Sequence, residues 1–129
     1  MPFYHAIVRP GILAESSRMQ FSSDVVDIHC GVTGAPRSFV HVLITEDTRG
    51  KLADGQNGVV SGTIRSGRTA EQKAEIVAGV CAALAARAGV DPDSVTVTSR
   101  DIQASYTMEG GALLPEPGSP EEHAWKELA

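Results

Sequence analysis

The sequence predicts an α/β fold in which a strand–helix–strand unit occurs twice. Two observations indicate this fold: strand and helix patterns alternate along the chain, and the two halves match at a fixed offset. Gly31 and Gly89, which we expect to end the two helices, lie 58 residues apart, as do Pro2 and Val60. We therefore predict a four-stranded sheet with both helices on one face. The other face would be left uncovered, which predicts a closed homo-oligomer.

The first unit begins with a strand at Phe3–Val8, which is apolar and stopped by Pro10-Gly11. A helix is expected from Glu15 to about Cys30, ended by Gly31. A second strand is expected over Ser38–Thr45, apolar on both faces. The helix is assigned from apolar residues at spacings of four, three and four, which place one face against the core: Phe21, Val25, Ile28 and Val32.

The second unit repeats this order. A strand at Val59–Ile64 leads to the clearest helix of the chain, Thr69–Ala88. Thr69 and Gln72 fit a capping box at its start, and Gly89 is expected to end it. The fourth strand is expected over Ser94–Ser99. The chain is thus expected to be a single domain, 1–129, with halves of about 2–50 and 58–100 and a C-terminal segment of 101–129.

The C-terminal segment departs from the repeated pattern. It carries a rigid, extended stretch, Leu113–Gly118, and a polar segment with the single tryptophan, Trp125. Two arrangements remain open at this point: a loose tail, or packing against a neighbouring subunit.

Composition excludes several classes of function. The net charge is −5, with no long basic run, so neither nucleic acid nor an anionic membrane is an expected partner. No apolar run approaches the roughly 18 residues of a membrane span, and no secretory signal is seen. Cys30 and Cys81 have no metal-ligand spacing and suggest free thiols in a reducing cytoplasm. We expect no metal and no cofactor.

Pro2 is the first candidate catalytic residue. If Met1 is removed, the Pro2 nitrogen becomes a free secondary amine at the start of the first strand. An α-amino group has a reference pKa of about 7.7–8.0, so modest shifts allow it to act as a base or as an acid near neutral pH.

Arg65 and Arg68 flank Gly67 just before the second helix, where they would form a compact cationic site able to bind a carboxylate. Solvated turn residues are the alternative. If the first and third strands ran parallel, this pair would lie far from Pro2 within one chain. His29 is either a satisfied core or surface residue or a hydrogen-bond donor to substrate. Glu109 precedes Gly110-Gly111 and is either exposed or able to activate water.

These residues resemble a known family. A duplicated βαβ unit that opens on Met-Pro is similar to the tautomerase superfamily. Local motifs resemble its cis-3-chloroacrylic acid dehalogenase group: a His-x-Gly-x-Thr-Gly run, an Arg-x-Gly-Arg turn, and a Glu ahead of Leu-Pro-x-Pro-Gly. Here these are His29–Gly34, Arg65–Arg68, and Glu109 with Leu114–Gly118.

The resemblance implies a homotrimer and a site acting on small carboxylic acids. Pro2 would be the catalytic amine, Glu109 would activate water, and Arg65, Arg68 and His29 would bind the substrate carboxylate. The expected function is that of a cofactor-independent tautomerase with weak hydratase or dehalogenase activity on 2-oxo or α,β-unsaturated acids. A non-catalytic trimeric assembly or binding protein is the alternative.

One position departs from the group's pattern. The dehalogenases carry a tyrosine eleven residues before the glutamate, where this chain has Thr98. Tyr106 lies nearby but out of register. This departure predicts that tautomerisation exceeds dehalogenation.

Overall fold

A computed structural model describes residues 1–128. Two strand–helix–strand units come first, followed by a short hairpin and a third helix. The elements are β1 (Phe3–Val8), α1 (Glu15–Thr33), β2 (His41–Glu46), β3 (Gly58–Arg65), α2 (Ala70–Ala88), β4 (Val95–Ile102), β5 (Met108–Glu109), β6 (Ala112–Leu113) and α3 (Pro120–Lys126).

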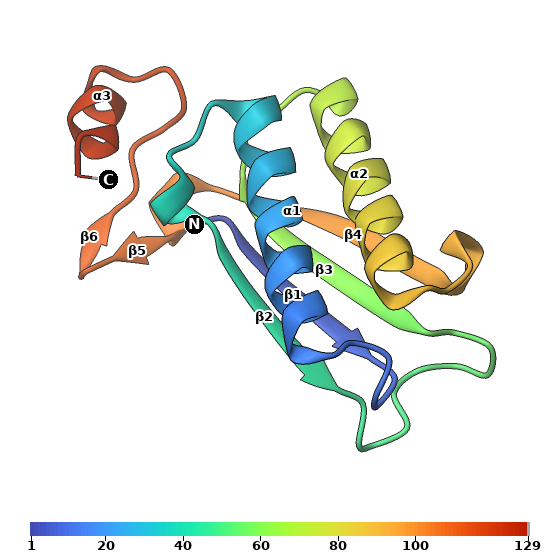
Figure 1. Ribbon diagram of the computed structural model, residues 1–129. Helices are drawn as coiled ribbons and strands as arrows, with labels where there is room; N and C mark the ends of the chain where they lie inside the picture. Colours follow the sequence, from blue (N-terminus) through green and yellow to red (C-terminus); the bar gives the residue numbers. More distant parts are fainter. Residues whose placement is uncertain (129) are drawn as a thin grey trace.

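The four long strands form one sheet in the order β2-β1-β3-β4 (Figure 1). β1 pairs in parallel with β2, and β3 with β4, while β1 and β3 run antiparallel. The parallel alignment of the first and third strands considered from the sequence is therefore wrong. Because Phe3 pairs with Thr63, the start of β1 lies at the end of β3 that carries Arg65. This register brings Pro2 and the arginine turn to the same end of the sheet within one chain.

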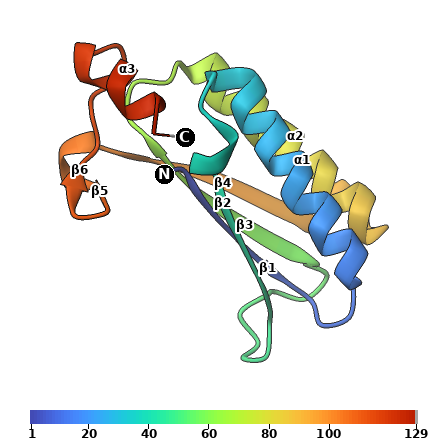
Figure 2. The same ribbon diagram turned by 60° about the vertical axis from the view of Figure 1, so that its left-hand side comes forward.

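Helices α1 and α2 cover one face of the sheet, as expected (Figure 2). Alternate residues of β1 point into this layer, so that Tyr4, Ala6 and Val8 are buried. The opposite face carries no helix, and Phe3 and Leu43 are 42% and 44% exposed on it. The core is closed by residues of the strands and both helices, among them Phe21, Val25, Val60, Ile64, Ile76, Val80 and Leu84.

The ends of the helices decide how the two units match. The predicted capping box of α2 is confirmed: Thr69 Oγ1 accepts from the Gln72 N–H at 3.1 Å, and Gly89 ends the helix in the left-handed region. The predicted end of α1 at Gly31 is wrong. Gly31 stays helical, and Gly34 at φ 73° is the residue that ends the helix. The offset between the two terminating glycines is therefore shorter than the one expected.

The second predicted strand begins later than expected. Residues Arg37–Phe39 form a 3₁₀ turn, and β2 starts only at His41. β2 is an edge strand, so its apolar side chains are only partly covered within one chain.

The C-terminal segment packs against the rest of its own chain. The β5–β6 hairpin and α3 lie at the amino-terminal end of β1 (Figure 1). The Trp125 ring packs on Phe39 with centroids 4.5 Å apart and lies under the Arg65 guanidinium. Trp125 therefore packs against residues of its own chain, where it is partly buried, while Leu113 is 61% exposed. None of the helices within residues 1–128 combines the length and apolarity needed to cross a membrane.

Candidate active site

The amino terminus and Glu109 meet at one end of the sheet. The Met1 amino group, one residue before Pro2, forms an ion pair with Glu109 Oε1. Glu109 reaches this position because β5 and β6 form a tight hairpin, in which Glu109 pairs with Ala112. Gly110 and Gly111 both have positive φ values, as a two-residue hairpin turn of this kind requires. The expected pair of Pro2 and Glu109 therefore lies together, with Pro2 itself buried.

His29 lies on the buried face of α1, and its ring is held by a residue that the sequence analysis did not single out. His29 is 1% exposed, and its Nδ1 lies 2.7 Å from the hydroxyl oxygen of Tyr4. Burial lowers the pKa of His29 to about 4, helped by the positive charges of Arg68, the amino terminus and Arg65. The ring is therefore neutral at pH 7. The charges that act on His29 are thus those of the arginine turn and of the amino terminus, which itself pairs with Glu109.

The tautomer of His29 follows from its partner. Burial raises the pKa of Tyr4, so its hydroxyl keeps a proton. Tyr4 is 1% exposed, and His29 Nδ1 is the hydrogen-bond partner of its hydroxyl among the described residues. A buried hydroxyl proton needs an acceptor, and Nδ1 is the atom in place to accept it. A hydroxyl donating to Nδ1 leaves the ring proton on Nε2. His29 can thus offer an Nε2–H donor, as the substrate-binding hypothesis requires.

Arg65 ends β3, and Arg68 lies in the turn before α2. Gly67 makes this turn possible: its φ is 114°, and a Cβ there would lie 3.1 Å from Cγ of Pro117. The turn and the Leu114–Gly118 stretch are therefore in direct contact. Burial and the nearby charge of Arg65 lower the pKa of Arg68, while the charge of Glu122 raises it.

The two arginines have different surroundings. Arg65 is 4% exposed; its Nη1 donates to the Pro115 carbonyl at 2.6 Å, and its Nη2 lies 2.7 Å from Glu122 Oε2. Its guanidinium also lies 4.6 Å from the centre of the Trp125 ring. Arg68 has no carboxylate partner within residues 1–128, and its buried Nε is unpaired there.

An apolar cavity adjoins the charged group. It has a volume of about 150 Å³ and is lined by Phe39, Leu114 and Trp125, with Glu109 on its wall. A bound molecule would meet a carboxylate and aromatic surfaces together. The apolar walls suit the apolar end of a small ligand.

Thr98 and Tyr106 are not part of this group in one chain. Thr98 lies in the middle of the edge strand β4, where it pairs with Ser61 on the uncovered face of the sheet. Tyr106 is 76% exposed in the turn after β4. Neither forms a hydrogen bond with Glu109 among residues 1–128.

Sequence reasoning missed two residues of the site. Tyr4 could have been found, because it is the bulky polar member of the alternating buried set in β1. Glu122 gave no signal. It is one of several acidic residues in a polar stretch, and only the return of α3 to Arg65 distinguishes it.

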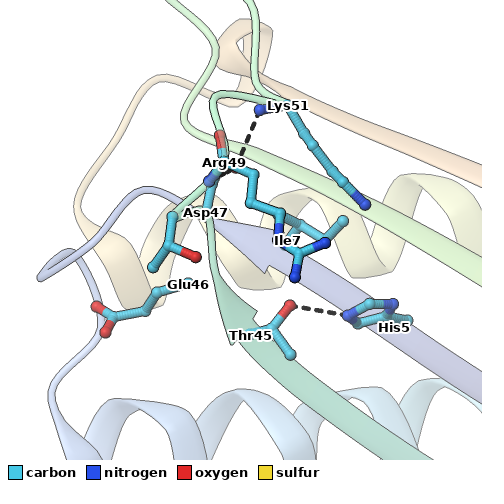
Figure 3. A pocket seen from close by; sticks show the side chains of 8 residues that line it. His5, Ile7, Thr45, Glu46, Asp47, Arg49 and Lys51 are labelled. Carbon is cyan, nitrogen blue, oxygen red and sulfur yellow. Dashed lines mark hydrogen bonds between the residues drawn. The ribbon is translucent and has the colours of Figure 1, made fainter.

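A second hollow lies at the opposite end of β1 and β2 (Figure 3). Its polar groups are mostly engaged in holding the chain: His5 Nε2 lies 2.8 Å from Thr45 Oγ1, and Asp47 accepts from the Lys51 N–H at 3.0 Å. Backbone N–H groups donate to the Asp47 carboxylate and lower its pKa, and the N–H of Leu52 has the largest effect. The polar groups of this hollow therefore hold the loop after β2 in place.

No protein-family model and no curated protein sequence matches the chain. Solved structures do match. A protein described as N1, a member of the cis-3-chloroacrylic acid dehalogenase family, superposes with a TM-score of 0.84 at 28% identity, over 95% of this chain and 89% of that chain. Native Ps01740 has a TM-score of 0.76 at 32% identity, over 83% of this chain and 99% of its own.

A fused 4-OT, described as a symmetric trimer, shares the fold, with a TM-score of 0.77 at 21% identity over 87% of this chain and 94% of that chain. The fold, the repeated unit and these similarities agree with the family resemblance of the sequence. The chain therefore belongs to the tautomerase superfamily, and within it is similar to the cis-3-chloroacrylic acid dehalogenase family.

Proposed function

We propose that the chain is a cofactor-independent enzyme that uses the amine of Pro2 on small 2-oxo or α,β-unsaturated carboxylic acids. The observation that supports this most directly is the meeting of the amino terminus, Glu109, His29 and the two arginines at one end of the sheet. These groups come from four separate elements, and a fold without a site at this place has no need to gather them. The amine requires removal of Met1, which is expected because proline is small.

The main proposed reaction is keto–enol tautomerisation. Neutral Pro2 takes a proton from the carbon next to the oxo group, and the protonated amine then delivers it to the oxygen, or the reverse. Arg68 binds the substrate carboxylate, and Nε2–H of His29 donates to the carboxylate or carbonyl oxygen. Both interactions stabilise negative charge that grows on the substrate in the transition state.

Hydration is the proposed secondary reaction, and Glu109 is the residue that favours it. Its carboxylate at the amino terminus would take a proton from water, whose oxygen attacks the β-carbon while protonated Pro2 adds a proton to the α-carbon. On a 3-haloacrylate the same addition leads to loss of halide. The charge state of Pro2 separates the two reactions, because the arginines favour the neutral amine and Glu109 favours the charged one.

We also propose that the protein forms a homotrimer in the cytoplasm. An uncovered sheet face with exposed Phe3 and Leu43 supports subunit association, and fused 4-OT structures of the same fold are described as trimers.

The test compares protein lacking Met1, verified by mass spectrometry, with protein that keeps it and with Pro2→Ala. Each is given enols of 2-oxo acids and cis-3-haloacrylates of defined geometry. Only protein with a free Pro2 amine should show full ketonisation. A Met1-retaining fraction with full activity would contradict the mechanism. The alternative, a non-catalytic trimeric assembly or binding protein, predicts no turnover of any acid and unchanged cellular behaviour of Pro2→Ala.

A further inference from the structure

The Glu122 carboxylate of α3 is held beside the Arg65 guanidinium by several contacts. Its side chain is 13% exposed; Oε2 lies 2.7 Å from Arg65 Nη2, and Oε1 accepts from the Gly118 N–H at 3.3 Å. Lys126 Nζ lies 3.4 Å from the same Oε1. The approach to Arg65 is close but poorly directed as a hydrogen bond, and Oε2 has no hydrogen-bond partner within residues 1–128. The contact is therefore chiefly an ion pair.

The carboxyl group of Glu122 is ionised at neutral pH. Burial opposes ionisation, but the Arg65 guanidinium, the Gly118 N–H and the charge of Lys126 outweigh it, and the pKa lies below its usual value. A full negative charge thus belongs to the site.

Within residues 1–128, Glu122 forms an ion pair with Arg65 but not with Arg68. Without Glu122, Arg65 and Arg68 would present two positive charges, which suit a substrate with two carboxylates. With Glu122 on Arg65, the three side chains carry one net positive charge, and Arg68 is left to bind one carboxylate. A second substrate carboxylate would have to pair with Arg65. The Glu122 carboxylate already occupies that position and would repel it.

We propose that Glu122 is a specificity-determining residue: it occupies Arg65 in place of a second substrate carboxylate and restricts the site to monocarboxylates bound at Arg68. This inference rests on the proposed function, because it assumes that carboxylic acids bind at the arginine turn. It adds the residue that selects among them and assigns the two arginines different roles, Arg68 in binding and Arg65 in positioning.

The test is Glu122→Gln, with Glu121→Gln as the matched control. Both variants lose one negative charge from α3, but Glu121 is exposed and makes no ion pair within residues 1–128. The substrates are a 2-hydroxy-2,4-dienoate with one carboxylate and the matching dienedioate with two. Saturated mono- and dicarboxylic acids of equal chain length serve as binding probes in calorimetry.

Wild type should prefer the monocarboxylate in both kcat/KM and affinity. Glu122→Gln should raise the dicarboxylate-to-monocarboxylate ratio about tenfold, as expected for removing one nearby charge. Glu121→Gln should leave the ratio unchanged.

Three results would overturn the inference. An unchanged ratio in Glu122→Gln would mean a purely structural contact. An equal rise for both acids would mean that Glu122 merely competes with any carboxylate for the site. A wild-type preference for the dicarboxylate would contradict the charge argument itself. Failure of the proposed function would look different. Wild-type protein with a free Pro2 amine would bind acids selectively but turn over neither substrate. The affinity ratio of the two acids would still decide the role of Glu122. If it bound neither acid, both proposals would fail.

Discussion

Tyr4 and His29 show how a buried hydrogen bond prepares a functional group. The imidazole lies among positive charges, and burial already disfavours its protonation. A neutral ring can still carry its proton on either nitrogen, so an N–H donor on the side of the substrate is not guaranteed. The Tyr4 hydroxyl removes this ambiguity because it donates to Nδ1 and leaves Nε2 as the donor.

The neutral state of His29 predicts a loss of stability in acid. Its pKa is 6.5 in a free chain and about 4 in the fold, so the unfolded chain binds a proton first as the pH falls. Stability from this group is complete above pH 6.5 and is lost between pH 6.5 and 4. Between pH 7 and 4.5, denaturant unfolding should show a drop that is about 2–3 kcal/mol larger for wild type than for His29→Gln, which cannot be protonated. Equal drops would mean that His29 is not held neutral by the fold.

The two arginines should respond differently to truncation. Arg68→Ala should remove about 1.5–3 kcal/mol of charge-assisted substrate binding, which lowers kcat/KM on a monocarboxylate. It should leave the free energy of unfolding nearly unchanged. Arg65→Ala should destabilise the fold by about 3 kcal/mol, since it removes the guanidinium that pairs with Oε2 of the largely buried Glu122 carboxylate. Steady-state kinetics with denaturant unfolding separates the two effects. Equal stability losses in both variants would contradict different roles.

At the scale of the element, β3 supports the site from beneath through Gly62. Gly62 lies opposite Tyr4 in the β1–β3 ladder, and a Cβ there would lie 2.6 Å from the Tyr4 ring. Gly62→Ala should therefore displace the ring, break its bond to His29 and reduce kcat/KM beyond what the stability loss explains. Gly58→Ala is the control on the same strand. Its Cβ would come closest to the flexible end of Leu84, at 2.9 Å, and would touch no residue of the site, so it should lower stability and leave kcat/KM of the folded protein unchanged.

Structure determination of Gly62→Ala would complete this test. An unmoved Tyr4 ring with normal activity would show that β3 does not constrain the site.

Local signals made some elements predictable and left others hidden. The ends of α2 were predicted correctly because the capping box and Gly89 act within a few residues. The end of α1 was not, because a glycine is permitted inside a helix and only the left-handed backbone at Gly34 marks the true end. Sequence patterns also give no direction to a strand pair, so the antiparallel pairing of β1 with β3 had to come from the structure.

The same reasoning applies to the site. Motifs singled out Pro2, His29, Glu109 and the arginine turn, and the structure brings all of them to one end of the sheet. The partners of Arg65 are the Pro115 carbonyl, 50 residues along the chain, and Glu122 in α3 beyond it. No local pattern predicts so distant an ion pair.

At the scale of the whole molecule, the sheet has two different faces. One is covered by α1 and α2 (Figure 2). The other exposes Phe3 and Leu43, with Ile7, His5 and Thr63 partly exposed beside them. The edges of the sheet, β2 and β4, are also unpaired on one side within this chain. A monomer would leave both the apolar face and two strand edges in water. Closed association of copies would cover both at once, and it would do so away from the helices.

This view predicts that a charge on the uncovered face dissociates the oligomer. Leu43→Asp places a carboxylate in the middle of β2 on that face, where burial between subunits would cost several kcal/mol without a partner. Met19→Asp is the control, since Met19 is 69% exposed on α1 in the helical layer. Light scattering at micromolar concentration should give a trimer for wild type and Met19→Asp, and smaller species for Leu43→Asp. A monomeric wild type, or a Leu43→Asp protein that stays trimeric, would show that this face is not where the copies meet. The fold would then have to tolerate its exposed strand edges by other means.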